Sequence, residues 1–355
     1  GGSYSSPGPG THNQIQFVTI PTAGDSTDFG DLTHTTRDGG SCASRTRGLY
    51  RFGTGPGDTN DNVDFFTMSS AGNAQDFGDM TYNNRGNEGL SNQTRGIFTG
   101  GDNDGSPRTY FNTIEFVTIA STGNGFDFGD RVVGGNSRTG GGASPTRGVM
   151  CGSQTSPYKQ IDFITIATTG NSQDFGEITN VVNNLSAACS TTRMVMGSNV
   201  SPLRPMDFLT IATQGNSISF GDMTVNRSSF AAMSDCVRGV FAGGDGSPVQ
   251  FSEIDYFNIA TTGDAVDFGD LPYDNQQTTG CSNGHGILRA DRITGLGGAN
   301  AITGSAKFFG SNYISVGKSS DFALGTGDWT VEYWAYPSSE VSYQRHFYLI
   351  GSSSG

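Results

Sequence analysis

Short runs of apolar residues recur along this chain, and glycine, asparagine and serine separate them. In the stretch IDFITIATTGNSQDFGEIT, Ile161 and Phe163 fall on one face of an extended segment, whereas Ile164 and Ile166 fall on the other. A strand that is apolar on both faces is expected where a sheet packs against neighbours on both sides. Because no segment has a convincing 3.6-residue period, the pattern predicts an all-β protein.

Six copies of this stretch follow one another along the chain. Each copy places the phenylalanine of a DFG or SFG triplet 14 residues after its first residue. A second element, in most copies an arginine followed by apolar residues, comes 17 to 19 residues after that phenylalanine, and the copies recur every 45 to 51 residues. Repeats of this length, built from short β-branched and aromatic runs, predict the blades of a β-propeller.

One repeat can be divided into four strands, here named a to d in chain order. In the fifth complete repeat they are expected at residues 229–234, 238–243, 253–260 and 266–271. Strand a is poor in bulky residues in every repeat. Small residues suit the innermost strand of a blade, where the blades converge on a central channel.

The chain begins in the middle of a repeat. Gly1-Gly2 corresponds to Gly243-Gly244 at the end of a strand b, and residues 278–290 supply an a–b pair that no c–d pair follows. We therefore expect a six-bladed propeller over residues 1–290, closed by pairing of its N- and C-terminal strands. A longer repeat array cut at Gly1 is the alternative.

The repeats resemble the kelch type of β-propeller. An arginine precedes strand a in four repeats, at Arg37, Arg85, Arg138 and Arg227, roughly 16 residues before a glycine or a Gly-Gly pair, and strands c and d carry aromatic residues. The phenylalanine of DFGD stands where kelch repeats have tryptophan. The resemblance implies the propeller architecture.

A different pattern begins after a glycine-rich linker at residues 291–304. The segment AKFFGSNYISVGKSSDFALGTGDWTVEYWAYPSS, which starts at Ala306, resembles the opening of a laminin-G or concanavalin-A-like jelly roll. The resemblance implies a two-sheet β-sandwich of a kind that often binds glycans or calcium. Residues 305–355 would be its N-terminal part, so a truncated sandwich is expected.

Acidic residues and arginines recur in the repeats. An acid follows each FG pair, at Asp31, Asp79, Asp130, Glu177, Asp222 and Asp270, and the second element carries Arg47, Arg95, Arg147, Arg193 and Arg238. A residue that recurs in every blade is expected to have a structural role in every blade, whereas catalysis requires one unique site. We therefore interpret these residues as turn caps and as ion pairs within or between blades.

The b–c loops vary in length and content, and they share one face of the disk with the d–a connections, so ligand binding is expected there. Tyr110, Phe111 and Tyr158 are the candidate ligand-facing residues. Asp102 and Asp104 are weak candidates for a calcium site, because a late bidentate glutamate is missing. The four histidines form no metal-binding or catalytic motif, so no catalytic residue is predicted.

A net charge of −13 without any basic run argues against nucleic acid and anionic membranes as partners. No signal peptide or membrane-spanning segment is visible. Propeller repeats followed by a laminin-G-like segment resemble structural proteins of marine tailed bacteriophages. That resemblance implies a non-enzymatic tail-fibre or appendage protein, located in the virion or outside the cell, that attaches to host glycans.

Other virion proteins and a host-surface receptor are the expected partners, and homo-oligomerisation is expected by analogy with symmetric appendages. No cofactor is predicted, apart from the calcium that the loop acids suggest. A bacterial surface or secreted adhesin is the second hypothesis. An enzyme that acts on polysaccharide is the third.

Overall fold

The computed structural model describes residues 1–4, 10–55, 58–59, 61–103, 105–133, 139–153, 156–180, 184–199, 204–246 and 249–284. The chain divides into two units between Ala290 and Asp291. The described ranges end at residue 284, so the predicted linker and the jelly-roll segment lie outside them. Within the described ranges there is no helix of the length and hydrophobicity that crossing a membrane requires.

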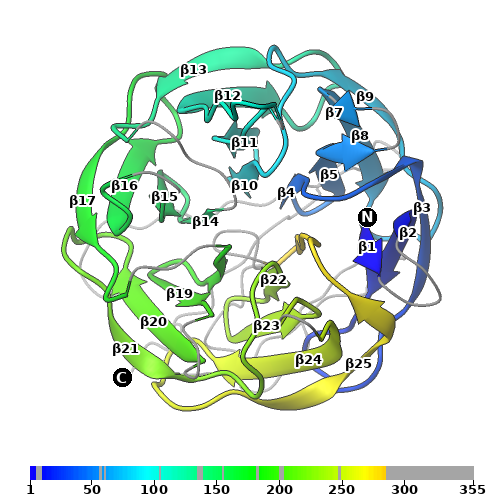
Figure 1. The fold of residues 1–355 in the computed structure, drawn as a ribbon, viewed down its shortest axis with the longest axis vertical. Helices are drawn as coiled ribbons and strands as arrows, with labels where there is room; N and C mark the ends of the chain where they lie inside the picture. Colours follow the sequence, from blue (N-terminus) through cyan, green and yellow to red (C-terminus); the bar gives the residue numbers. More distant parts are fainter. Residues whose placement is uncertain are drawn as a thin grey trace, which may run out of the picture. The chain divides into compact units, whose positions relative to one another are not determined.

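The described part of the chain is a six-bladed β-propeller, consistent with kelch-like repeats (Figure 1). Five blades are four-stranded antiparallel sheets whose strand order from the centre outward follows the chain. Blade 1 comprises β4 (Gly40–Ala43), β5 (Arg47–Arg51), β8 (Asn62–Thr67) and β9 (Gln75–Asp79); blade 2 comprises β10 (Glu88–Ser91), β11 (Arg95–Thr99), β12 (Thr113–Thr118) and β13 (Phe126–Asp130). Blade 3 comprises β14 (Gly140–Ala143), β15 (Arg147–Cys151), β16 (Gln160–Thr165) and β17 (Gln173–Glu177); blade 4 comprises β18 (Ser186–Cys189), β19 (Arg193–Gly197), β20 (Pro205–Thr210) and β21 (Ile218–Asp222). Blade 5 comprises β22 (Ala231–Ser234), β23 (Arg238–Ala242), β24 (Phe251–Asn258) and β25 (Val266–Asn275).

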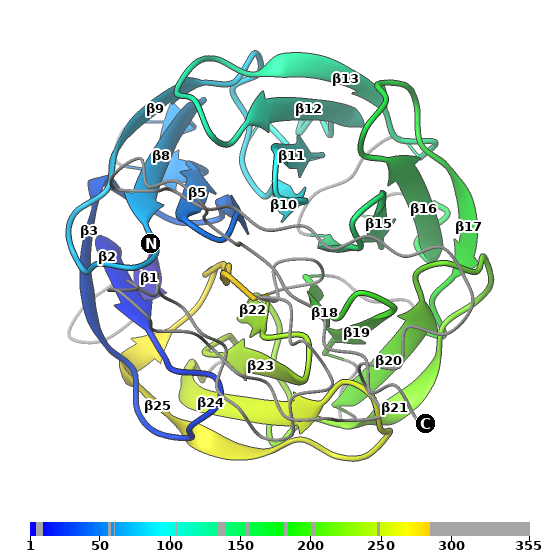
Figure 2. The ribbon, with the colours of Figure 1, turned by 180° about the vertical axis from the view of Figure 1, so that it is seen from behind.

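Blade 6 contains both ends of the described chain. Its sheet is formed by β1 (Gly2–Tyr4), β2 (Gly10–Phe17) and β3 (Thr27–Thr36). A separate two-stranded ribbon, β6 (Thr54–Gly55) with β7 (Asp58–Thr59), lies in the b–c connection of blade 1. Figure 2, seen from behind, shows blade 6 between blade 5 and blade 1.

The apolar pattern of strand c is explained by packing on both sides of each blade. Ile161 and Phe163 in β16 are buried in a cluster with residues of blade 4, such as Leu209. Ile164 and Ile166 are buried in another cluster with residues of blade 2, such as Ile114. The two-faced strand predicted from the sequence is therefore confirmed, and the hydrophobic core lies between the blades.

Contacts far apart in sequence join blade 6 to its neighbours. Ser3 and Gln276 exchange backbone hydrogen bonds of 2.9 and 3.0 Å. On the inner side, Ser282 donates to the Ser234 carbonyl of blade 5, and the hydroxyls of Thr279 and Ser41 of blade 1 lie 2.8 Å apart. Residues 279–284 thus occupy the innermost position of blade 6. The strand b expected near residues 285–290 lies outside the described ranges.

Hydroxyl groups link the inner strands of neighbouring blades. Ser91, the last residue of β10, donates to the carbonyl of Ala43, the last residue of β4. Ser234 donates in the same way to Cys189, and Ser282 donates to Ser234. Because each donor is fully or largely buried, these bonds satisfy backbone groups that would otherwise line the seam between two blades.

The repeated arginines hold adjacent blades together, but they do not do so as ion pairs. The Nη1 atom of Arg147 donates to the carbonyls of Ile211 and Ala212 in blade 4, both at 2.9 Å. The same guanidinium lies 4.4 Å from the ring centroid of Phe163. Arg47, Arg95, Arg193 and Arg238 make equivalent contacts with the next blade.

The ion-pair interpretation of these arginines is therefore wrong, and the topology gives the reason. Each arginine begins strand b, next to the a–b turn, whereas each repeated acid is the fifth residue of strand d, towards the opposite face of the disk. The acids contribute through the backbone instead. The Asp130 amide, for example, donates to Asn171 Oδ1 in the c–d turn of blade 3.

Candidate functional site

The connections between strands divide the propeller into two faces. The face with the a–b and c–d turns is called the turn face here, and the face with the b–c and d–a connections is called the loop face. On the loop face, the b–c connection of blade 2 runs from Thr99 to Thr113, and that of blade 3 runs from Cys151 to Gln160. All the predicted ligand-facing residues belong to these two connections.

The aromatic residues of the loop face differ in exposure. The Tyr158 side chain is 45% exposed, whereas Tyr110 and Phe111 are half-buried. Phe111 lies beside Tyr82, with ring centroids 6.2 Å apart, and Tyr82 is 40% exposed. Tyr82 was not among the predicted residues, because it lies in a d–a connection and no local pattern brings it next to Phe111.

Asp102 lies in a buried ion pair rather than on an exposed loop. Its Oδ1 atom is 3.1 Å from Arg85 Nε and 3.5 Å from Arg108 Nε. Two guanidinium groups beside one carboxylate oppose the approach of a metal cation. The other metal candidate, Asp104, lies outside the described residues. Among the residues that the structure describes, no group of three or more His, Cys, Asp or Glu side chains could hold a metal ion.

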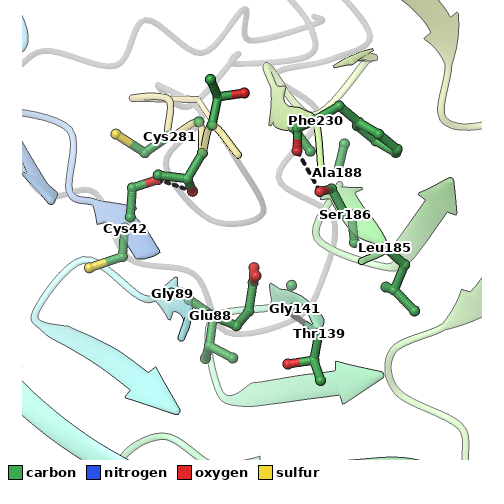
Figure 3. A pocket seen from close by; sticks show the side chains of 18 of the residues that line it. Cys42, Glu88, Gly89, Thr139, Gly141, Leu185, Ser186, Ala188, Phe230 and Cys281 are labelled. Atoms are coloured by element: carbon green, nitrogen blue, oxygen red, sulfur yellow. Dashed lines mark hydrogen bonds between the residues drawn. The ribbon is translucent and has the colours of Figure 1, made fainter. Parts of the chain in front are cut away.

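The inner strands surround a central channel with a cavity of about 100 Å³. Glycine, alanine, serine and threonine line most of it, and the Glu88 side chain extends into it (Figure 3). Gly40 and Gly140 occupy the position of Glu88 in the two adjacent blades. Burial raises the pKa of Glu88 well above its usual range, and a hydrogen bond from the Gly141 backbone only partly opposes this. Burial in the channel therefore shifts Glu88 towards its neutral form relative to an exposed glutamate.

Five buried carboxylates form a further repeated feature, which was not among the predicted sites. They occupy the second position of the repeated stretch, at Asp64, Glu115, Asp162, Asp207 and Asp255. Four of them accept a hydrogen bond from a threonine of the preceding blade. The Thr33 hydroxyl, for example, donates to Asp64 at 2.9 Å. These carboxylates fasten strand c of one blade to the end of strand d of the blade before it.

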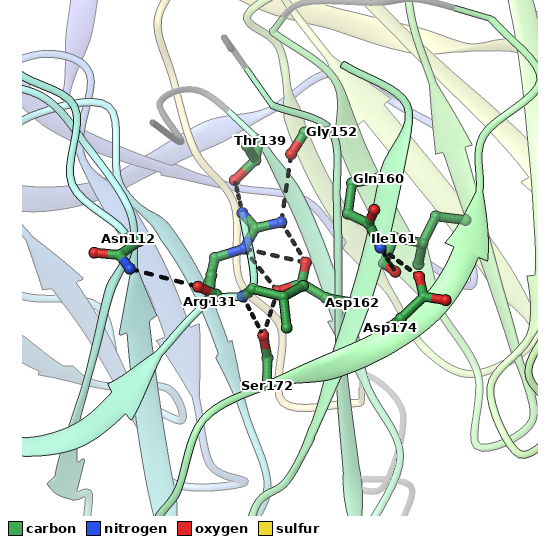
Figure 4. Close-up of polar contacts among 10 residues, drawn as sticks. Asn112, Arg131, Thr139, Gly152, Gln160, Ile161, Asp162, Ser172 and Asp174 are labelled. Atoms are coloured by element: carbon green, nitrogen blue, oxygen red, sulfur yellow. Dashed lines mark hydrogen bonds and ion pairs between the residues drawn. The ribbon is translucent and has the colours of Figure 1, made fainter. Parts of the chain in front are cut away.

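Three of the five carboxylates also have a buried arginine partner. Arg131 approaches Asp162 at 2.5 Å, and both side chains are 0% exposed (Figure 4). Arg51 pairs with Glu115 at 3.0 Å, and Arg227 pairs with Asp255 at 2.9 Å. Arg131 directly follows a strand d, Arg51 ends a strand b, and Arg227 lies before a strand a.

Asp64 and Asp207 are the two carboxylates of this set without a buried arginine partner. Burial raises the pKa of both, and the hydroxyl and amide groups around them only partly compensate. The sequence signal for this set was present, since an acid precedes the aromatic residue of strand c in five repeats. Its burial could not be inferred from that position, because an acid within an apolar strand is ordinarily expected at a surface.

Comparisons with known proteins bear on the fold. No protein-family model matches the chain, and no curated protein matches it. A solved structure titled "Structure of YjhT" is 9% identical and superimposes with a TM-score of 0.56, covering 70% of this chain and 88% of that chain. One fold serves many unrelated functions, so this likeness concerns architecture alone. The chain is therefore a six-bladed β-propeller with repeats consistent with the kelch type.

Proposed function

We propose that this protein is a non-enzymatic attachment protein whose loop face binds glycans. The observation that carries the proposal is the exposure of Tyr158 and Tyr82 on that face, at 45% and 40%. The repeated polar residues, by contrast, join blades: Arg147 donates to a backbone carbonyl of blade 4, and Asp162 accepts from Arg131 of blade 2. The side chains that differ between blades are therefore the better candidates for binding a ligand.

Aromatic side chains suit a sugar ligand because they offer a broad apolar face with little conformational entropy to lose. Tyr82 and Phe111 lie together where blade 1 leads into blade 2, and Tyr158 lies on the adjacent blade 3. This spacing over neighbouring blades suits an extended chain of sugars better than a single small molecule. The Phe111 ring supports Tyr82 and so limits its freedom before a ligand binds.

The setting that we propose is a tail fibre or another appendage of a phage virion, with other virion proteins and a host-surface receptor as partners. Support for this setting comes from the resemblance of the repeats and the laminin-G-like segment to such proteins. Homo-oligomerisation belongs to the same proposal. Immunogold labelling of purified particles tests the setting. Label on cell envelopes and not on particles would favour a bacterial adhesin instead.

Glycan binding can be tested on a polysaccharide array made from host surfaces. The expected result is that Tyr158→Ala and Tyr82→Ala each weaken binding about fivefold, which corresponds to about 1 kcal/mol for one lost aromatic contact. Phe126→Ala is the matched control, because Phe126 is 63% exposed but begins strand d, next to the turn face. Equal losses in all three variants would contradict a loop-face site, and release of sugar fragments would favour the enzymatic alternative.

A further inference from the structure

Positive charge is unevenly distributed over the described part of the propeller. Three cationic side chains that reach the loop face are Arg108, Lys159 and Arg204, and they belong to the b–c connections of blades 2, 3 and 4. The other exposed arginine of the described ranges, Arg45, lies in an a–b turn on the opposite face. Lys159 itself is half-buried, and the remaining described arginines are buried or half-buried, among them Arg37 in the d–a connection before blade 1. Blades 2, 3 and 4 thus each place one cationic side chain in a b–c connection.

Each of these three side chains is held by a contact with the protein. Lys159 Nζ donates to the Thr179 carbonyl at 2.6 Å, and Arg204 donates to the Thr224 carbonyl. Arg108 lies 3.5 Å from the Asp102 carboxylate and is 43% exposed. A lysine carries three donors and an arginine five, so one contact leaves most donors of Lys159 and Arg204 available to a ligand. These contacts also reduce the side-chain conformational entropy that would be lost on binding.

The acids of the loop face do not cancel this asymmetry. Each blade carries one acid directly after the FG pair of strand d, as with Asp130 in blade 2 and Glu177 in blade 3, so these carboxylates form a similar background in all six blades. The blades differ at the position that Lys159 and Arg204 occupy. Blade 1 has Asp61 there, and blades 2, 5 and 6 have neutral residues. At this position cations therefore occur in blades 3 and 4 alone, and Asp102 in the b–c connection of blade 2 is paired with Arg85 and Arg108.

Aromatic and cationic side chains coincide in the b–c connections of blades 2 and 3. Tyr158 is the residue immediately before Lys159, and Phe111 follows Arg108 by three residues in the same connection. We propose that the loop face of blades 2 to 4 binds an anionic glycan, with the aromatic rings against the sugars and with Lys159 and Arg204 on carboxylate or sulfate groups. Arginine can hold such groups with two parallel hydrogen bonds, and lysine acts as a compact point charge. This inference rests on the proposed glycan-binding function and specifies the ligand class.

The test compares three immobilised polymers: dextran sulfate, polygalacturonate and uncharged dextran. Binding of the whole chain is measured by interferometry for the wild type and for the double variant Lys159→Gln/Arg204→Gln. Arg45→Gln is the control for losing an exposed cation elsewhere. Because the whole chain has a net charge of −13, general attraction to polyanions is not expected.

The proposal predicts that at least one charged polymer binds more tightly than dextran, and that the double variant weakens this binding at least tenfold while Arg45→Gln leaves it unchanged. Raising the salt concentration should also weaken it. The polymer that is preferred distinguishes sulfate from carboxylate. Far-UV circular dichroism checks folding, and Arg204→Lys, which keeps the charge, should retain part of the affinity.

Two outcomes would overturn the anionic assignment. One is equal binding of dextran and both charged polymers, with no effect of the double variant, although Tyr158→Ala still reduces binding; glycan binding itself would then stand. The other is equally tight binding of a single-stranded oligonucleotide, which would mark a general anion site. If no polymer binds and Tyr158→Ala changes nothing on the host array, the proposed function fails as well.

Discussion

The buried pair of Arg131 and Asp162 allows the sharpest test of how the blades are joined. Arg131 follows β13 of blade 2, and its Nε and Nη2 atoms lie 3.1 and 2.5 Å from Asp162 Oδ1 in β16 of blade 3. Replacement by methionine keeps the apolar stem but leaves Asp162 with only the Ser172 hydroxyl, at 2.7 Å. Removing one partner of a fully buried pair costs about 3–5 kcal/mol, because the other charge stays uncompensated. We expect Arg131→Met to destabilise the protein by that amount.

The assay is equilibrium urea unfolding of the wild type, Arg131→Met, Asp162→Asn and the double variant. In the Asp162→Asn background, Arg131→Met should lower the free energy of unfolding much less than it does in the wild type. The difference between the two effects is the coupling energy, expected to be at least about 2 kcal/mol for a buried charged pair. Asp207→Asn is the matched control, because Asp207 occupies the same position in blade 4 and has hydroxyl partners but no buried arginine. The reasoning is refuted if Arg131→Met costs less than about 1 kcal/mol, or if its cost is the same with aspartate or asparagine at position 162.

Three further predictions concern the channel and the seams between blades. Burial raises the pKa of Glu88 in the folded protein, so its contribution to stability is greatest below the ordinary value of 4.5 and declines as the pH rises towards the folded-state pKa. Glu88→Gln should therefore gain stability relative to the wild type as the pH rises above 4.5, and urea unfolding at several pH values that gave a constant difference would contradict this. In the pattern set by Ser91, Ser234 and Ser282, a serine at position 43 is expected to donate to the Ser282 carbonyl. Ala43→Ser should therefore raise the free energy of unfolding by about 1 kcal/mol, whereas any loss would show that the hydroxyl does not fit. Arg147→Ala removes two hydrogen bonds to blade 4 and the stacking on Phe163, so the free energy of unfolding should fall by about 1.5–3 kcal/mol; a change under about 0.5 kcal/mol would mean that these contacts are not stabilising.

The arrangement of strands could be predicted well because it depends on local chemistry. The expected strand b of blade 5, residues 238–243, corresponds to β23 at Arg238–Ala242, and the expected strand c, residues 253–260, corresponds to β24 at Phe251–Asn258. Alternating apolar residues and turn-forming glycines act over a few positions, so a linear pattern reveals them. The small residues of strand a likewise indicated the innermost position.

The candidate site could be predicted only in part. Variable b–c loops pointed to one face and to Tyr158, because exposed loops tolerate differences in length and content. The contact of Phe111 with Tyr82 and the pairing of Asp102 with two arginines depend on how separate connections meet in space. Neither follows from the spacing of these residues along the chain.

By itself the sequence determined the all-β class, the division into repeats and the two-faced strand c, because each rests on the periodicity of apolar residues within one segment. Only the tertiary structure decided the partners of the polar residues. Arg238 donates to the carbonyl of Ile20, 218 residues away, and three arginines from unrelated positions in the repeat reach equivalent carboxylates. A buried charge is stabilised by whichever opposite group the packed blades bring within a few ångströms, and that proximity is a property of the closed ring, not of any local stretch of chain.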